Sequence, residues 1–397
     1  MKIAVFTKST TLHKNHGGLE TQNRTLCEGL SKKGHQITVF SPKKEIGVES
    51  IEENGVKYIF IDSDYKNYIF ARFKKDSWTK KSLKVFSKIN EKENFDIVLG
   101  QSASAESIVE NKSNLGVKVV SIAHGTTSGE FSTFIKNISS IKDIYWLVRN
   151  TQYFLRQYFG RQRRYVLHSD MVVAVSNYVK KSLISETFVS ENKVKVIHNG
   201  VDPSLFEREE KDRDIGGVVN LYFIGRVEKS KGILTMIDIV RDIDRDIVFH
   251  IVGDGSCMEE TKKRVGKYRL QEKVSFHGRL PRLEVSKFIK NISPDIFVFP
   301  TQRVEGFPMV IVEAMLAGIP TVAFDFGGVS DAVKDGETGY LIDAGNNRSF
   351  RKRVTDLIDD RRTRIKFGKN SKEMAEKEFT IGKMVDSYEK AFMEVIN

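Results

Sequence analysis

Short apolar runs rich in β-branched residues alternate along this chain with longer segments in which apolar residues recur every three to four positions. The short runs predict strands, and the longer segments, such as 19–33 and 232–241, predict amphipathic helices. Strands that alternate with helices form parallel sheets covered on both faces, so we expect an α/β fold. Strands are expected at 2–7, 36–41, 57–61, 96–100, 118–124, 170–176, 193–198, 220–225, 246–253, 273–277, 295–300, 320–324 and 339–342.

A break in this pattern divides the chain in two. The length of 397 residues is about twice that of a typical domain. The turn signals Asn199-Gly200 and Asp202-Pro203 are followed by a charged stretch and by Gly216-Gly217. We therefore expect two Rossmann-like, doubly wound domains at 1–203 and 204–377, with a C-terminal helix at about 378–397 packing back onto the first. Ligands bind at the carboxyl ends of strands in such sheets, so the site is expected in a cleft that the two domains face.

The residues after the strand expected at 295–300 predict a helix start beside two carboxylates. The run is Glu305-Gly306-Phe307-Pro308-Met309-Val310-Ile311-Val312-Glu313, with Pro308 at the first helical position. Free N–H groups and the positive dipole end at a helix start suit an anion or sugar hydroxyls. Glu313 is the only charged residue between Gly306 and Phe324, and its burial requires a partner such as a ribose diol. Alternatively, Glu313 caps a neighbouring backbone group and Glu305 is an ordinary loop carboxylate.

A second loop, Gly225-Arg226-Val227-Glu228-Lys229-Ser230-Lys231-Gly232, follows the apolar run 220–224. Arg226 can bind phosphate in a bidentate manner, and Lys231 provides a mobile point charge. Together they can bind a diphosphate and stabilise the charge that grows when it departs. The alternative is a basic loop that only faces solvent, which suits Lys229 best.

Composition narrows the class of protein. The chain is 40% hydrophobic and 29% charged, which excludes disordered and collagen-like chains. Its two cysteines, Cys27 and Cys257, favour a reducing compartment. The apolar run 3–6 is too short for the core of a signal peptide, and no run approaches the roughly 20 apolar residues of a membrane span. We therefore expect a cytoplasmic protein.

The net charge of +12 lies entirely in the first half. Residues 1–200 contain 31 Lys/Arg and 19 Asp/Glu, whereas residues 201–397 contain 33 of each. Aromatic and basic residues are interleaved in 64–94 and 131–165, a pattern that suits helices in the interface of an anionic membrane. The same pattern suits single-stranded nucleic acid, or helices whose aromatic residues form core. We expect an anionic membrane surface and a lipid-linked or glycan acceptor, and no nucleic acid, so the protein is expected to be peripheral on the inner face of the cell membrane.

In combination, these motifs resemble the retaining glycosyltransferases of family 4, which have the GT-B fold. The resemblance rests first on Glu-x7-Glu, formed by Glu305 and Glu313, and on the Gly-Arg-x4-Lys-Gly loop before it. Asp331 departs from the family, which often has Glu shortly after its Gly-Gly pair. Further matches extend over nearly the whole chain: Gly17-Gly18-Leu19-Glu20, Asn199-Gly200-Val201-Asp202, Val252-Gly253-Asp254-Gly255, Phe276-His277-Gly278, Gly327-Gly328 and Asp335-Gly336-x2-Gly339-Tyr340.

The resemblance implies a role for each matching residue. Glu313 binds the nucleotide ribose, Glu305 lies beside the transferred sugar, and His124, after the strand expected at 118–124, lies near the anomeric carbon. A side chain at Gly18 would block the approach of phosphates. The implied catalytic residues are His124, Glu305, Arg226 and Lys231, and the implied donor-binding residues are Gly17, Gly18, Arg226, Lys231, Gly306, Phe307, Pro308 and Glu313.

The resemblance also implies a reaction. A sugar passes from a UDP- or GDP-sugar to an acceptor hydroxyl with retained configuration, without a cofactor or metal, and the acceptor is expected to be a lipid-linked or cell-envelope glycan precursor. Asp62-Ser63-Asp64 matches the Asp-x-Asp metal motif of the other large glycosyltransferase fold. The same spacing recurs elsewhere in this charged chain, for example from Asp242 to Asp244, so we expect no metal site.

Other functions remain open at this point. A nucleotide-sugar epimerase or a sugar-phosphate glycosyltransferase would share the fold. A non-catalytic sugar-nucleotide binding subunit would show damaged motifs, whereas Arg226, Lys231, Glu305 and Glu313 are all present. A nicotinamide dehydrogenase is disfavoured because no Gly-x-Gly-x-x-Gly follows the first strand.

Overall fold

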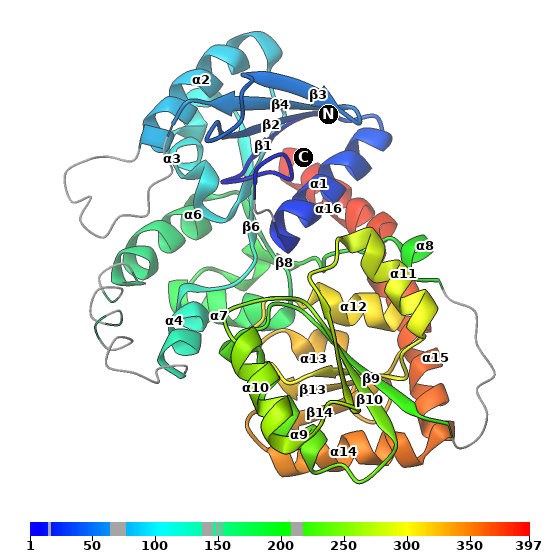
Figure 1. Cartoon of the computed structure of the whole chain (residues 1–397). Helices are drawn as coiled ribbons and strands as arrows, with labels where there is room; N and C mark the ends of the chain where they lie inside the picture. Colours follow the sequence, from blue (N-terminus) through cyan, green and yellow to red (C-terminus); the bar gives the residue numbers. More distant parts are fainter. Residues whose placement is uncertain are drawn as a thin grey trace. The chain divides into compact units, whose positions relative to one another are not determined.

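The computed structural model describes residues 1–14, 17–63, 77–136, 145, 147, 151, 154–207 and 217–397. It contains two compact units: unit 1 comprises Met1–Gly200 and Ile381–Asn397, and unit 2 comprises Val201–Thr380. The domain ends expected from the sequence, 203 and 377, each differ from these by three residues. The last helix, α16 (Ile381–Ile396), belongs to unit 1, where it packs against α1 (Gly18–Lys32), as Figure 1 shows in red and blue.

The described strands of unit 1 form an eight-stranded sheet in the order β3-β4-β2-β1-β5-β6-β7-β8. Every pairing is parallel except that of β3 with β4. The strands are β1 (Lys2–Phe6), β2 (Gln36–Pro42), β3 (Ser50–Glu53), β4 (Val56–Ile61), β5 (Ile97–Gln101), β6 (Lys118–Ala123), β7 (Met171–Ala174) and β8 (Val194–Val196). The helices besides α1 and α16 are η1 (Ser102–Ala105), α2 (Ser77–Glu93), α3 (Glu106–Leu115), α4 (Thr127–Lys136), the π-helical turn η2 (Gln157–Gln162), α6 (Arg163–His168), α7 (Asn177–Thr187) and η3 (Glu191–Lys193).

The central strands of unit 1 are buried on both faces, which explains their continuous apolar runs. An aromatic cluster fills the core under α2 and α3. The Phe6 ring stacks on Phe40 with ring centroids 5.0 Å apart and meets the edge of Phe86 at 5.4 Å. Trp78 is fully buried in the same cluster, and its indole N–H donates to the Ser104 carbonyl oxygen at 2.9 Å. These contacts fix the sheet whose carboxyl edge is considered below.

The described strands of unit 2 form a six-stranded, parallel sheet in the order β11-β10-β9-β12-β13-β14. Side chains of α9, α10 and α14 share one core with the sheet, while α12 contacts β12 and β13 and packs on α8 and α15. The strands are β9 (Val219–Ile224), β10 (Ile247–Val252), β11 (Val274–Gly278), β12 (Ile296–Phe299), β13 (Thr321–Asp325) and β14 (Gly339–Asp343). The helices are α8 (Pro203–Phe206), η4 (Lys229–Lys231), α9 (Ile233–Arg241), α10 (Met258–Tyr268), α11 (Arg282–Ile292), α12 (Met309–Leu316), α13 (Val329–Ala332), α14 (Asn347–Asp359) and α15 (Arg361–Glu378). Both sheets confirm the expected class of two Rossmann-like, doubly wound domains.

The first and last residues of unit 2 lie side by side. Val201 pairs with Thr380 in a parallel bridge, and its N–H donates to the Phe379 carbonyl oxygen at 2.8 Å. Unit 2 is thus a continuous segment whose two ends are hydrogen-bonded to one another.

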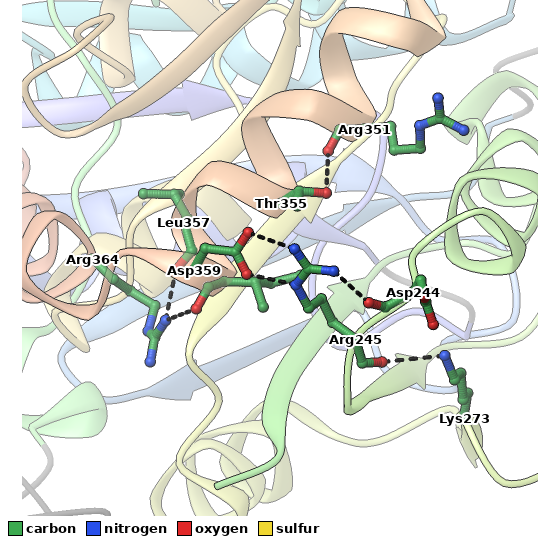
Figure 2. Close-up of polar contacts among 9 residues, drawn as sticks. Asp244, Arg245, Lys273, Arg351, Thr355, Leu357, Asp359 and Arg364 are labelled. Atoms are coloured by element: carbon green, nitrogen blue, oxygen red, sulfur yellow. Dashed lines mark hydrogen bonds and ion pairs between the residues drawn. The ribbon is translucent and has the colours of Figure 1, made fainter. Parts of the chain in front are cut away.

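Charged side chains tie together the amino-terminal edge of the unit 2 sheet, as Figure 2 shows. Arg245, just before β10, makes a bidentate contact with Asp359 at the end of α14, with Nε–Oδ1 2.7 Å and Nη2–Oδ2 3.1 Å. Lys273, just before β11, donates to the carbonyl oxygens of Ile243 and Arg245, each at 3.1 Å. Arg364 donates to two carbonyl oxygens at the end of α14. This edge is therefore structural, and it lies opposite the carboxyl ends of the strands.

Candidate functional site

The carboxyl ends of β9 and β12 are neighbours at the point where the strand order of the unit 2 sheet changes direction. The loop after β9 carries Arg226 and Lys231, and the loop after β12 carries Glu305. Adjacent crossovers leave such a switch point in opposite directions, so the loops diverge there and leave room for a ligand. The two motifs singled out in the sequence therefore meet at one place in the sheet.

Lys231 and Glu305 form the centre of this site. Lys231 Nζ lies 2.6 Å from Glu305 Oε1, and their side chains are 16% and 15% exposed. The buried Thr301 hydroxyl donates to the same Glu305 oxygen at 3.1 Å, and Lys231 Nζ lies 5.6 Å from the centre of the Phe299 ring. The pair thus presents one cation and one carboxylate in a setting that is largely screened from water.

Close backbone contacts hold both members of the pair in place. Gly232 has φ +72°, and a Cβ there would come within 1.8 Å of the Pro300 carbonyl oxygen. Gly327 has φ +75°, and a Cβ there would come within 2.3 Å of the Glu305 carbonyl oxygen, which also accepts the Gly328 N–H at 2.7 Å. Only glycine fits these two positions, so Gly232 of the Lys-Gly motif and Gly327 of the Gly-Gly motif serve to position Lys231 and Glu305.

Arg226 lies on the same loop but forms its ion pair with a different residue. Its ion pair among the described residues is with Glu228, Nη1–Oε1 2.9 Å, and its side chain is 59% exposed. The expected joint grip of Arg226 and Lys231 on a diphosphate therefore requires the Arg226 side chain to leave Glu228.

Gly306, Phe307 and Pro308 lead into α12. Phe307 and Pro308 are buried, and the Phe307 ring meets the Phe379 ring with centroids 5.3 Å apart. Pro308 is the N-cap residue, and the helix begins at Met309, so the sequence placed proline one residue too far into the helix. Proline has no side-chain acceptor for the first N–H groups of a helix, and those groups are therefore not capped by Pro308.

Glu313, one turn into α12, is a buried carboxyl group. Burial raises its pKa to about 7, and Arg282, whose Nη2 lies 3.5 Å from Glu313 Oε1, opposes that rise. Nε of Arg282 is buried without a hydrogen-bond partner among the residues that the structure describes. Sequence reasoning missed Arg282, because no pattern relates the start of α11 to the middle of α12.

In unit 1, His124 follows β6 and Gln101 ends β5. His124 Nε2 lies 2.6 Å from Gln101 Oε1, and burial lowers the pKa of His124 to about 4. The imidazole is therefore neutral at cellular pH. The expected position of His124 at a strand end is confirmed, whereas Gln101 carried no signal in the sequence.

Gly17 and Gly18 have different surroundings from Gly232 and Gly327. Gly17 is the N-cap of α1, and its N–H donates to the Glu20 carboxylate at 2.9 Å. A Cβ on Gly18, the first residue of α1, would meet no atom of the described residues within 4 Å. The fold of unit 1 therefore does not itself require glycine at 18.

The basic, aromatic segments separate into core and surface. In 64–94, residues 64–76 lie outside the described part of the chain, and Trp78 and Phe86 are core. In 131–165, residues 137–144, 146, 148–150 and 152–153 lie outside it. Among the described residues of this second segment, four large apolar side chains are exposed: Ile135, Tyr145, Leu155 and Phe159.

The structure describes the Asp-x-Asp triplet only in part. Asp64 lies outside the described residues, and the Asp62 side chain is 95% exposed, 4.0 Å from Lys81 Nζ. Across the described ranges, no three His, Cys, Asp or Glu residues gather in a group that could hold a metal ion. None of the described helices combines the length and the apolar character needed to cross a membrane.

Comparison with known proteins assigns the chain to a family. The model of Glycosyltransferase Family 4 matches residues 16–205, and that of Glycosyl transferases group 1 matches residues 207–374. The uncharacterized glycosyltransferase MJ1178 of Methanocaldococcus jannaschii is 28% identical over 342 residues, 84% of this chain and 87% of that protein. The UDP-Gal:alpha-D-GlcNAc-diphosphoundecaprenol alpha-1,3-galactosyltransferase of Escherichia coli is 29% identical over 240 residues, 57% of this chain and 60% of that protein.

Solved structures agree on the fold. Anabaena Alr3699/HepE, whose structure holds UDP and glucose, superposes with a TM-score of 0.71 at 17% identity, covering 99% of this chain and 100% of that one. The two family models together span most of the chain, and the fold is GT-B. The Lys231–Glu305 pair at the switch point agrees with both. This chain belongs to glycosyltransferase family 4 and is a glycosyltransferase with the GT-B fold.

Proposed function

We propose that this enzyme transfers a hexose, with retention of configuration, from a UDP- or GDP-sugar to a hydroxyl of a lipid-linked or cell-envelope glycan precursor. The observation that carries the proposal is the Lys231–Glu305 pair at the switch point of unit 2, with the buried Glu313 on the next helix. Binding a nucleotide sugar requires a cation for the diphosphate, a carboxylate for the sugar hydroxyls and a carboxylate for the ribose diol.

The pair supports a simple order of events. When the donor binds, Lys231 exchanges Glu305 for the diphosphate, and the released Glu305 carboxylate accepts hydrogen bonds from the sugar. The bond between the anomeric carbon and the β-phosphate oxygen then breaks, and its electron pair stays on the phosphate. Lys231, Arg226 and the N–H groups at the start of α12 stabilise that charge.

The acceptor completes the exchange. Its hydroxyl oxygen attacks the anomeric carbon from the face that the diphosphate leaves, and its proton passes to the departing phosphate oxygen. In this scheme His124 lies at the donor sugar and supports its position. Glu305 acts through hydrogen bonds rather than as a nucleophile.

Variants of the loop after β9 test the assignment. Lys231→Ala and Arg226→Ala should each reduce sugar transfer by about a hundredfold, since each removes one contact to the growing phosphate charge. Lys229→Ala is the matched control, because Lys229 lies exposed on the same loop. Full turnover in both variants would show that Lys231 and Arg226 do not stabilise the departing diphosphate.

Donor and metal dependence are tested directly. The Escherichia coli relative uses UDP-Gal and the Anabaena structure holds UDP, so the thermal unfolding midpoint of this protein should rise more with UDP than with GDP or ADP. We propose that Lys231 and Arg226 neutralise the diphosphate in place of a divalent cation. Transfer should then persist in EDTA, and its loss on chelation would contradict this part of the proposal.

The acceptor side is proposed to lie on an anionic membrane. Ile135, Tyr145, Leu155 and Phe159 expose apolar surface in a segment whose basic residues outnumber its acidic ones seven to one. Aromatic and basic side chains together favour the interface of a membrane with anionic lipids. The Escherichia coli relative acts on a diphosphoundecaprenol-linked sugar, a lipid-linked acceptor.

Vesicle co-sedimentation tests the membrane proposal. The protein should bind vesicles of phosphatidylglycerol and phosphatidylcholine at low salt, but not vesicles of phosphatidylcholine alone. Phe159→Ser should weaken binding, while Phe188→Ser, at an exposed phenylalanine that caps the C-terminus of α7, should not. Binding that is equal for both variants and both lipid mixtures would exclude the proposed surface.

A further inference from the structure

Three polar side chains, the buried Asn23 and Gln101 and the partly buried His124, form a chain of hydrogen bonds at the carboxyl edge of the unit 1 sheet. Gln101 Nε2 donates to Asn23 Oδ1 at 2.6 Å, and Gln101 Oε1 lies 2.6 Å from His124 Nε2. His124 follows β6, Gln101 ends β5, and Asn23 lies on α1, the helix that begins at Gly18. The network therefore connects the switch point of unit 1, between β1 and β5, to the strand end that carries His124.

The directions of these hydrogen bonds determine where the imidazole proton lies. Asn23 Oδ1 accepts from Gln101 Nε2 and also from the Cys27 thiol at 3.9 Å, so it acts as the acceptor at this end. The Gln101 amide then presents its carbonyl oxygen to His124. A carbonyl oxygen can only accept, so His124 Nε2 must carry the proton.

The other ring nitrogen is left as a bare acceptor. Nδ1 of His124 is buried and has no hydrogen-bond partner in the described part of the chain. Because burial also disfavours the charged ring, a second proton does not occupy Nδ1 near neutral pH. A buried acceptor without a partner costs free energy in the unliganded protein, which a ligand hydroxyl would recover.

We propose that Gln101 is a positioning residue that holds His124 as its Nε2–H tautomer, so that the Nδ1 lone pair accepts a hydrogen bond from a hydroxyl of the bound sugar. This inference rests on the proposed function, which places His124 at the donor sugar. It adds a residue that contacts no substrate and assigns a direction to the hydrogen bond that His124 makes.

Ring-¹⁵N NMR of histidine-labelled enzyme without substrates tests the tautomer. The His124 signals are identified by their absence in His124→Gln. At pH 7, Nδ1 should show the shift of an unprotonated nitrogen and Nε2 that of a protonated one. The opposite tautomer would overturn the proposal, whether or not the enzyme transfers sugar.

Two substitutions of Gln101 test the positioning role. Gln101→Glu keeps the size of the side chain and places a carboxylate against Nε2, so it should raise the pKa of His124 toward neutrality. The value of kcat should then fall as pH decreases through that new pKa, because a protonated Nδ1 can no longer accept, and it should recover at higher pH. Gln101→Leu should mix the tautomers and reduce kcat about tenfold or more at every pH.

The matched control is Gln22→Glu, which makes the same substitution at another buried glutamine, on α1, whose side-chain amide contacts Met384 Sδ. It should leave the His124 spectrum and pH profile unchanged. Unchanged kcat and tautomer in folded Gln101→Leu would refute the positioning role. Absence of transfer by wild-type enzyme to any acceptor, with the tautomer as expected, would refute the proposed function instead.

Discussion

Glu313→Gln is the perturbation whose magnitude follows most directly from the structure. The Glu313 carboxyl has an ordinary pKa of 4.5, and burial raises its pKa to about 7 in the folded protein. The folded state therefore binds more protons than the unfolded state between these two values. Stability must fall as pH rises from about 4.5 and must level off above about 7.

The size of this effect follows from the shift. At about 1.4 kcal/mol for each pKa unit, a shift from 4.5 to about 7 corresponds to about 3 kcal/mol between pH 4 and pH 8. Glutamine has the same shape and cannot ionise, so Glu313→Gln should lose this pH dependence. Relative to wild type, the variant should gain about 3 kcal/mol at pH 8 and almost nothing at pH 4.

Urea unfolding of unliganded protein at both pH values measures the difference. The same variant should bind UDP roughly ten- to a hundredfold more weakly, because a neutral amide replaces a charged acceptor for the ribose hydroxyls. Stability that changes with pH in the same way in wild type and Glu313→Gln would refute the reasoning. A gain in stability with unchanged UDP affinity would support the raised pKa of Glu313 but would exclude a role for Glu313 in binding the ribose.

Three further predictions concern other parts of the protein. Gly18→Ala should leave the unfolding midpoint unchanged, because its Cβ meets no described atom within 4 Å. It should nevertheless slow sugar transfer at least tenfold if phosphates approach this backbone, and unchanged kcat/KM would show that Gly18 does not belong to the donor site. Gly327→Ala should both destabilise unit 2, by more than about 1 kcal/mol, and reduce transfer, since its Cβ would displace the backbone of Glu305; an intact urea midpoint would contradict the close approach. Arg245→Ala should lower the unfolding midpoint slightly without changing UDP affinity, because the Asp359 contact lies at the opposite edge of the sheet; weaker UDP binding by calorimetry would contradict that separation.

The hydrophobic pattern predicted most of the fold. Every expected strand overlaps an observed one, because parallel strands buried on both faces must be continuous apolar runs. β3 was not predicted. It is an antiparallel edge strand with the sequence Ser-Ile-Glu-Glu, and most of its side chains are exposed, so burial imposes no pattern on it.

The site was predictable only in part. Lys231 and Glu305 follow strands, and the strand order, which the sequence does not encode locally, brings those two strands together. Arg282 and Gln101 could not be found, because each matters through one tertiary contact made by a residue with no local signal. Thus the sequence revealed the chemically unusual residues, whereas the partners of those residues could be identified only from the three-dimensional structure.

The hydrogen-bonded ends of unit 2 have a practical consequence. Because Val201 and Thr380 pair with one another, unit 2, which we propose binds the donor, is inserted into the chain as a self-closed cassette rather than appended to it. Such a cassette can be exchanged between relatives by two cuts at equivalent points, with no loop to redesign. Chimaeras made in this way would separate the choice of donor from the choice of acceptor, so that the two specificities could be engineered independently.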